Sequence, residues 1–284
     1  MSTANELEQR RWNDEHWAAV WPRREQLTSA VTDLLLAHLA HVEGQRVLDV
    51  GSGGGTTAFA VAGRVGGASG GGVSGSGASG GGGSVVGADI SAPLVRFAAG
   101  RARAMGLANV SFTVADVQQE TIDGGPFDAV VSQFGVMFFD EPPVAFANIR
   151  AHAVPGARLA FACWQPADQN PWWAGRAVAR FLDPPTPPPG KVTGGPFALG
   201  DPDHASAVLA AAGWTNVERT PYRISVAVER EAITLDEEQL AFMGITASDL
   251  DEARAALDAH LAGLERDDGR YDAELAIQIF TATA

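Results

Sequence analysis

Apolar runs that suit buried strands alternate along the first part of the chain with runs whose apolar positions have helical spacing. The strand patterns are residues 46–50, 84–90, 109–115, 127–132 and 158–164. The helical patterns are residues 29–41, 56–65, 92–105 and 142–153. Strands that alternate with helices in this way predict a doubly wound α/β fold around a parallel sheet.

A segment of low complexity interrupts this pattern at residues 66–84, which are almost entirely glycine, serine and alanine. Such a segment cannot bury a core, so we expect a flexible insertion. Residues 75–80 match the dinucleotide motif GxGxxG by chance, because no strand leads into them and no helix follows. The preceding helix returns to the amino edge of the sheet, whereas ligands bind outside the carboxyl ends of the strands. We therefore expect the insertion to lie far from any site.

The pattern changes after the fifth strand. Residues 165–196 are rich in proline, glycine and tryptophan and leave the carboxyl end of that strand, where a long connection is more often a lid or binding loop than a linker. A helix over residues 203–213 and a strand over residues 217–228 follow. Residues 235–264 are helical with an acidic outside, and residues 274–281 alternate as a final strand.

Before the first strand, residues 6–21 form a predicted helix that Pro22 ends or kinks. Trp17 and Trp21 are four residues apart and therefore share one face of this helix. That face either docks on the domain as part of its core or covers a binding site, and the spacing alone leaves both readings open.

The net charge and the cysteine content limit the binding partners and the compartment that we expect. The formal net charge of −14 opposes binding to nucleic acid or to an anionic membrane. The lone cysteine, Cys163, excludes an internal disulfide and suits a reducing compartment, so a cytoplasmic protein is expected. The chain begins with polar and charged residues and has no apolar run of about 18 residues, so neither a signal peptide nor a membrane span is expected.

The candidate chemistry begins where the first strand ends. Asp49 lies near that end, and Gly51, Gly53 and Gly55 follow in the spacing DxGxGxG before the next helix. Glycines let a ligand lie against the backbone, and a helix N-terminus offers free N–H groups. A carboxylate here attracts an ammonium group and repels a pyrophosphate. The stretch resembles motif I of the class I S-adenosylmethionine (SAM) methyltransferases, whose cofactor carries an ammonium group and no phosphate.

Acids also follow the second and third predicted strands. Asp89 and Asp116, each taken alone, equally suit a helix cap or a solvated loop. Together with Asp49 they place carboxylates at three strand ends along one edge of the sheet. The resemblance implies that Asp89 accepts the ribose hydroxyls of SAM and that Asp116 accepts the adenine amino group. It also implies that the backbone N–H of Val117 meets an adenine ring nitrogen.

The resemblance covers residues 46–164 apart from the insertion, and it implies a Rossmann-like sheet of seven strands in the order 3-2-1-4-5-7-6. The helical cap would then be inserted inside the closing antiparallel hairpin. Residues 1–43 are expected to form a helical flap, residues 44–164 the SAM-binding core, and residues 165–284 the lid loop, cap and hairpin. The expected cofactor-binding residues are Asp49, Gly51, Ser52, Gly53, Asp89, Ile90, Asp116, Val117, Ser132 and Trp17.

The function implied by the resemblance is transfer of the SAM methyl group to a small, fairly apolar molecule, with a hydroxyl as the favoured acceptor. Two alternatives stay open: a SAM-binding regulator without turnover, and an NAD(P)-dependent oxidoreductase, which would need GxGxxG in the first turn. No catalytic residue is assigned, and His16, His204 and Asp140 are candidate bases by location only. The six histidines are scattered, so no metal site is expected. The oligomeric state stays open, a homodimer included.

Overall fold

The computed structural model describes residues 6–39, 41–66, 82–182 and 195–284. Its strands are β1 (Arg46–Val50), β2 (Ser84–Asp89), β3 (Val110–Val114), β4 (Phe127–Gln133), β5 (Ala153–Trp164), β6 (Thr215–Val228) and β7 (Tyr271–Thr283). They form one sheet in the order β3-β2-β1-β4-β5-β7-β6, which confirms the predicted topology. β1 to β5 run parallel, and β7 lies antiparallel between β5 and β6.

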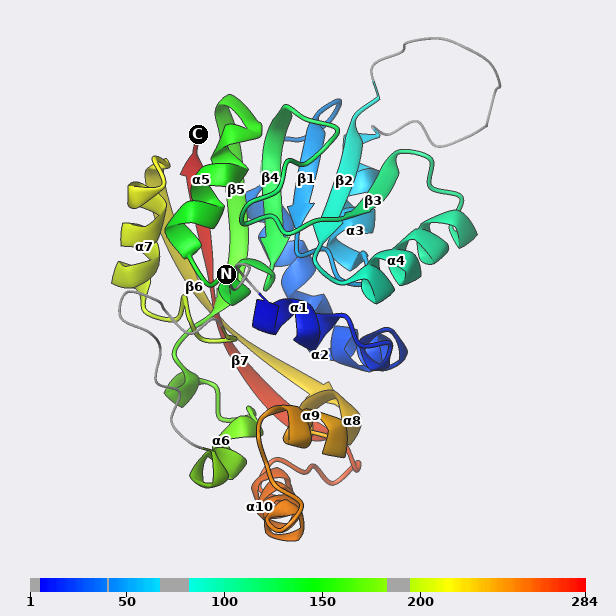
Figure 1. Cartoon of the computed structure of the whole chain (residues 1–284), viewed down its shortest axis with the longest axis vertical. Helices are drawn as coiled ribbons and strands as arrows, with labels where there is room; N and C mark the ends of the chain where they lie inside the picture. The colour runs from blue at the N-terminus through cyan, green and yellow to red at the C-terminus, as the bar shows by residue number, and fades with distance from the viewer. Residues whose placement is uncertain (1–5, 40, 67–81, 183–194) are drawn as a thin grey trace.

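Helices cover both faces of this sheet. The helices of the described ranges are α1 (Glu6–Trp12), α2 (His16–His38), α3 (Thr56–Val65), α4 (Ala92–Ala104), α5 (Pro142–Ala151), α6 (Gly175–Val178), α7 (Pro202–Ala211), α8 (Arg230–Ile233), α9 (Glu237–Phe242) and α10 (Leu250–Ala262). α2 and α3 pack together on one face, and α5 and α7 pack together on the other (Figure 1). Because both faces are covered, the central strands are buried, as in β1, whose last four residues are all buried, the charged Asp49 among them.

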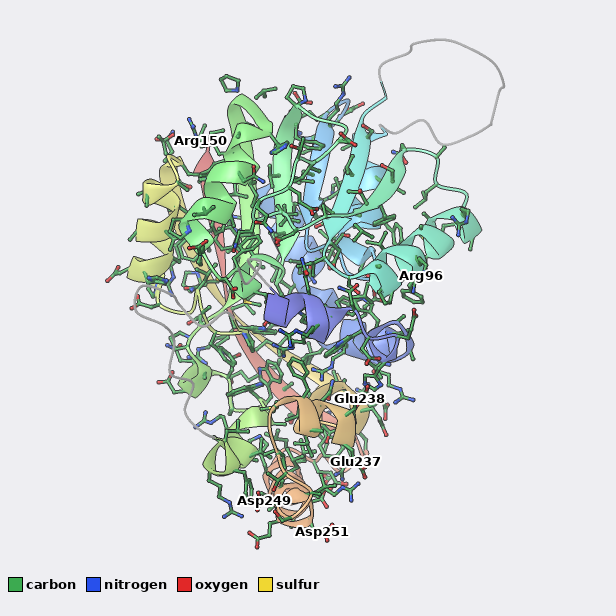
Figure 2. All side chains as sticks on the ribbon, viewed as in Figure 1. Arg96, Arg150, Glu237, Glu238, Asp249 and Asp251 are labelled. Atoms are coloured by element: carbon green, nitrogen blue, oxygen red, sulfur yellow. The ribbon has the colours of Figure 1, made fainter. Side chains whose placement is uncertain are left out.

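The far end of the molecule is a small helical cap. α8, α9 and α10 lie between β6 and β7 in the chain, and Figure 1 shows them beyond the end of the sheet. The cap shares an apolar cluster with α6, separate from the main core and formed by Ala174, Val178, Leu240, Ile245, Ala253 and Leu257. Figure 2 shows Glu237, Asp249 and Asp251 among the acids on its surface. The helical run predicted over residues 235–264 is in fact two helices, and Gly244 between them has a φ of +97°.

The N-terminal segment differs from the prediction of a helix that stops or kinks at Pro22. α1 ends at Trp12, and α2 runs without interruption through Pro22 to His38. Proline removes one hydrogen bond from a helix, and the packing of α2 on α3, α4 and several strands holds the helix together. The break lies instead at Asn13, whose Oδ1 accepts the N–H of Ala92 at 2.9 Å and whose Nδ2 donates to the carbonyl of Ile90 at 3.2 Å.

Two sequence features fall outside the described residues, namely the GxGxxG match at residues 75–80 and the proline cluster at residues 184–189. None of the helices in the described ranges combines the length and the hydrophobicity that crossing a bilayer requires. The thiol of Cys163 is buried in β5, and burial raises its pKa to about 12, which disfavours the reactive thiolate form.

Candidate active site

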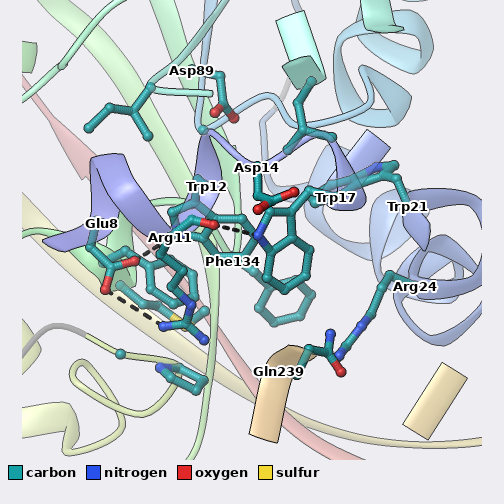
Figure 3. Close-up of a pocket in the computed structure, with 18 of the residues that line it drawn as sticks. Glu8, Arg11, Trp12, Asp14, Trp17, Trp21, Arg24, Asp89, Phe134 and Gln239 are labelled. Carbon is teal, nitrogen blue, oxygen red and sulfur yellow. Dashed lines mark hydrogen bonds and ion pairs between the residues drawn. The ribbon is translucent and has the colours of Figure 1, made fainter. Parts of the chain in front are cut away.

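A cavity of about 740 Å³ opens at the carboxyl ends of the parallel strands. Its walls come from the sheet edge, from α1 and α2, from the segment after β5 and from α9. Figure 1 shows α1 across the strand ends, and Figure 3 shows Asp89 and Gln239 on opposite sides of the cavity. The volume is typical of a small-molecule site. The cavity lies where the topology of a doubly wound sheet places ligands.

The glycine turn after β1 is held in a backbone conformation that a side chain would strain. Gly53 has a φ of +51°, and a Cβ atom on it would lie 2.2 Å from the ring of Trp21. A Cβ atom on Gly51, at a φ of +66°, would lie 2.6 Å from the Cα of Gly135. The glycine spacing read from the sequence is therefore required by close approach of α2 and of the loop after β4.

Asp49 is a buried carboxylate without a hydrogen bond of normal geometry. Its side chain is 1% exposed, and neither carboxylate oxygen has a donor at hydrogen-bond distance within the described part of the chain. Burial, reinforced by the negative charge of Asp89, raises the pKa of Asp49 well above its ordinary value, and the nearby backbone N–H of Ala58 lowers it in part. A buried polar group of this kind is costly unless something donates to it, so the position suits a cationic ligand group.

Asp89 links the ends of the first two strands. Its Oδ2 accepts the N–H of Gly53 at 2.7 Å, and its Oδ1 accepts the N–H of Ser91 at 2.8 Å. Burial raises the pKa of Asp89, and these backbone donors lower it in part. The carboxylate also lines the cavity, so the same group that fixes the glycine turn faces the space where a ligand would lie.

Asp116 follows β3 and is likewise buried, at 3% exposure. It accepts the N–H of Gln118 and the side-chain amide of Gln119, each at 3.1 Å. Asp116 and Val117 both line the cavity beside Asp89. The structure thus brings the second and third strand-end acids to one wall, as the sequence predicted for neighbouring parallel strands.

The predicted cofactor residues divide into two groups. Those that line the cavity are Gly51, Asp89, Ile90, Asp116, Val117 and Trp17. Those that lie behind its wall are Asp49, Ser52, Gly53 and Ser132. The hydroxyl of Ser132 donates to the carbonyl of Val50 at 2.7 Å within the sheet, whereas the buried hydroxyl of Ser52 has no partner in the described residues.

The N-terminal helices are fastened beside the second strand end. The hydroxyl of Ser91 donates to the carbonyl of Trp12 at 2.5 Å. The rings of Trp12 and Trp17 lie 4.4 Å apart, and the indole N–H of Trp17 donates to the carbonyl of Arg11 at 2.5 Å. Trp17 therefore both packs on its neighbours and lines the cavity. The aromatic face of this helix thus serves in docking and in covering the site at once.

The candidate bases are separated by the structure. His16 lines the cavity, and its two ring nitrogens lie 2.9 Å from Asp236 and 3.1 Å from Glu238. His204 lies in α7, and neither it nor Asp140 lines the cavity. His16 is thus engaged with the cap in a way that the sequence did not indicate.

Several cavity residues escaped the sequence analysis, among them Arg24, Phe134 and Gln239. Trp17, Trp21 and Arg24 follow one another at helical spacing, so a helix continued through Pro22 would have placed all three on one face. Phe134 lies directly after β4 with a φ of +63°, a conformation that no periodic pattern reveals.

A family model described as "Methyltransferase domain" matches residues 41–171. Nocamycin O-methyltransferase from Saccharothrix syringae is 30% identical over 131 residues, which are 46% of this chain and 42% of that protein. Aklanonic acid methyltransferase DauC from Streptomyces sp. is 31% identical over 120 residues, which are 42% of this chain and 48% of that protein. The matched stretch thus spans less than half the length of either relative.

Two solved structures share the fold. A SAM-dependent methyltransferase from Aquifex aeolicus aligns with a TM-score of 0.51 at 16% identity, covering 97% of this chain and 96% of that one. Phosphoethanolamine N-methyltransferase 2 from Haemonchus contortus, solved with S-adenosyl-L-methionine, aligns with a TM-score of 0.57 at 14% identity, covering 100% of this chain and 60% of that one.

Proposed function

We propose, from the premise that residues 41–171 are a class I SAM-dependent methyltransferase domain, that this protein transfers the methyl group of SAM to a small, fairly apolar molecule. The observation that carries the proposal is Asp49. Its buried carboxylate forms no hydrogen bond of normal geometry in the described residues, and the methionine end of SAM carries an ammonium group. A pyrophosphate ligand would bring further negative charge to this place.

The residues expected to hold SAM are those of the three strand ends. Asp49, behind the glycine turn, would balance the ammonium group, directly or through water. Asp89 would accept the ribose hydroxyls, and Asp116 with the backbone N–H of Val117 would meet the adenine edge. Their placement around one end of the cavity supports these roles, because four of the expected contacts, Asp89, Ile90, Asp116 and Val117, share its wall.

The chemistry supplied by SAM is a methyl group on a sulfonium, which is already a good leaving group. The chain's own contribution is to hold the acceptor in line and to keep water away from it. Positioning of this kind can supply roughly 7–11 kcal/mol of barrier reduction. The rings of Phe134, Trp164 and Trp172 give the cavity the apolar wall that this task requires.

The favoured acceptor group is a hydroxyl on a small molecule. The enclosed aromatic lining suits a small apolar body, and the net charge of −14 opposes a nucleic-acid substrate. Two relatives are named for methylation of small molecules, one of them as an O-methyltransferase. These observations support a small-molecule acceptor for this chain as well.

Ligand-dependent stability tests the proposal. SAM and S-adenosylhomocysteine (SAH) should each raise the unfolding temperature, by an amount that grows with the logarithm of their concentration over their dissociation constant, while NAD should not. Release of SAH from SAM in the presence of hydroxylated aromatic compounds should separate an enzyme from a SAM-binding regulator. Stabilisation by NAD without stabilisation by SAM would contradict the proposal.

A further inference from the structure

The cavity extends from Asp89 to Gln239, and we call the side of Gln239 its second half (Figure 3). The lining of the cavity combines aromatic rings with charged side chains such as Asp14 and Glu238. Phe134 stacks on Trp164 with ring centroids 4.2 Å apart and planes 14° apart, and Trp172 lies 5.0 Å from Trp164. Surfaces of this kind favour a flat, unsaturated molecule, because offset stacking adds to the burial of apolar area.

Arg24 brings an unbalanced positive charge into this half. The side chain lines the cavity, and Figure 3 shows it reaching from α2 toward Gln239 of α9. In the described ranges no carboxylate lies within ion-pair distance of Arg24, and its nearest aromatic contact is the ring of Trp17 at 5.9 Å. Burial lowers the pKa of Arg24, yet a guanidinium keeps its proton at physiological pH.

The acids nearest to Arg24 are already engaged by other groups. Asp236 raises the pKa of Arg24 from a distance, but its Oδ1 accepts the N–H of Gln239 at 2.9 Å. Its Oδ2 lies 2.9 Å from a ring nitrogen of His16, and Glu238 lies 3.1 Å from the other ring nitrogen. Both carboxylates thus already have close partners, and neither lies within ion-pair distance of the guanidinium.

Arg11 provides the internal comparison. It lines the same cavity, but Glu8 lies 3.6 Å from its guanidinium, and the rings of Phe138 and Phe242 lie 5.5 Å away. The charge of Arg11 is thus balanced inside the protein, whereas the charge of Arg24 is balanced only at a distance. A cation held in an apolar site without a close counter-charge gains most from a ligand that brings one.

We propose that the methyl acceptor is an aromatic acid whose carboxylate pairs with Arg24 while its rings lie between the aromatic walls. This statement rests on the proposed methyl transfer and adds a substrate class to it. One guanidinium matches one carboxylate in a bidentate pair. A phosphate monoester would carry nearly two charges and leave one of them uncompensated among the aromatic rings. The pairing would fix which end of the acceptor faces the cofactor.

The test compares matched acids and amides. Benzoate, 2-naphthoate and anthracene-2-carboxylate, each beside its carboxamide, are titrated into the wild-type protein, Arg24→Gln and Arg24→Lys, with and without saturating SAH. The matched control is Arg23→Gln, because Arg23 is the exposed neighbour on the same helix and does not line the cavity. The unfolding midpoint and SAH affinity of every variant are measured alongside.

In the wild type and in Arg23→Gln, at least one acid should bind about tenfold more tightly than its amide, as expected for a charge-assisted pair. Arg24→Gln should abolish this preference, and Arg24→Lys should keep part of it. Equal binding of acids and amides, a preference that survives in Arg24→Gln, or no binding by any acid would overturn the proposal. SAH binding is the separate readout of the proposed methyltransferase function, so the two failures are distinguishable.

Discussion

Two like charges stand close together at the first two strand ends. Asp49 and Asp89 are both buried, burial raises the pKa of each, and Asp89 adds to the rise at Asp49. Asp89 has two backbone donors, whereas Asp49 has none at bonding distance in the described chain. The protein therefore holds at Asp49 a group that is unfavourable for stability alone, a pattern typical of functional sites.

Replacement of Asp49 by asparagine tests this cost. The folded state raises the pKa of this carboxyl above its ordinary value of 3.8. Such a group destabilises the fold increasingly as the pH rises from the ordinary pKa to the pKa in the folded state. Asp49→Asn should therefore be more stable than the wild type near pH 7, and the difference should shrink as pH falls toward 4. Urea unfolding between pH 4.5 and 7.5 measures it. A variant that loses stability relative to the wild type as pH rises would contradict the interpretation.

The same variant should bind SAM more weakly, because the ammonium group would lose its counter-charge. In the wild type, SAM should favour the ionised form of Asp49, so its affinity should rise with pH over the interval in which this carboxyl titrates. Asp49→Asn should flatten that dependence. Calorimetry at several pH values measures both effects.

The proposed contact between Asp89 and the ribose of SAM is tested by removing the carboxylate. Asp89→Ala should weaken SAM binding by about 1–3 kcal/mol through loss of charge-assisted hydrogen bonds. Asp123→Ala is the matched control, because Asp123 is exposed and does not line the cavity. Since Asp89 also accepts two backbone N–H groups, the unfolding midpoint is measured with the affinity. Wild-type SAM affinity in a folded Asp89→Ala protein would contradict the assignment of Asp89 to the ribose.

At the scale of elements, α2 connects the sheet edge to the cap. Its Trp21 lies on the glycine turn, and its first residue, His16, lies between two acids of the cap. Glu25 of the same helix accepts from the indole N–H of Trp21 at 3.0 Å and from Arg101 at 2.6 Å. One helix thus contacts the turn, α4 and the cap, so a movement of the cap would reach the cofactor end of the cavity.

The contact of His16 with the cap is tested by replacing the histidine. The contact joins a half-buried imidazole to two partly exposed carboxylates, and contacts of this kind at the surface are worth about 0–1 kcal/mol, so His16→Gln should barely change the free energy of unfolding. It should instead loosen α9 locally and reduce the hydrogen-exchange protection of that helix. His41→Gln, at an exposed histidine that does not line the cavity, is the control. Unchanged protection of α9 in His16→Gln would show that the contact does not hold the cap.

The sequence was sufficient for the strands but not for the N-terminal helices. β1, β2 and β4 are short apolar runs that end at or just before a polar or glycine position, so local pattern and fold agree there, whereas β5 begins at Ala153, before the predicted start at residue 158. The corner at Asn13 depends on bonds to Ile90 and Ala92, residues far away in the chain. Arg24 was missed because its place in the cavity requires α2 to continue through Pro22, which packing decides and local preference does not.

The candidate site likewise has one part that the sequence predicts and one part that it does not. Asp49, Asp89 and Asp116 could be predicted together, because the carboxyl ends of neighbouring parallel strands share an edge. The acceptor half could not, since it joins α2, the segment after β5 and α9, which meet only in the folded chain. Phe138 illustrates the limit: it is half-buried against Trp12 while it lines the cavity, a double role that local pattern does not reveal.

At the scale of the whole molecule, the insertion begins and ends at the amino edge of the sheet. The N–H of Gly83 donates to the carbonyl of Val65 at 3.2 Å, and that carbonyl also accepts from Gly44 at 3.0 Å. The two ends of the insertion therefore meet at the end of α3, where a short turn is enough to join them.

Replacement of residues 67–81 by a short glycine-serine turn should leave SAM affinity within about twofold, because the flanking residues lie at the edge opposite the cavity. The free energy of unfolding should rise slightly, since closing a shorter loop costs less entropy. Calorimetry and urea unfolding measure the two quantities. A large loss of affinity would mean that the insertion contributes to the site.

The place of β7 has a consequence for how the chain is made. This strand follows all the others in sequence, yet it lies between β5 and β6 and is the sole sheet neighbour of β6 among the described residues. During synthesis, residues 215–228 therefore have no strand with which to form backbone hydrogen bonds until the ribosome has made the cap and β7. The sheet edge of β5, from which the aromatic wall continues at Trp164, is covered in the same step, so the acceptor half of the cavity is completed only after residues 271–283 have emerged.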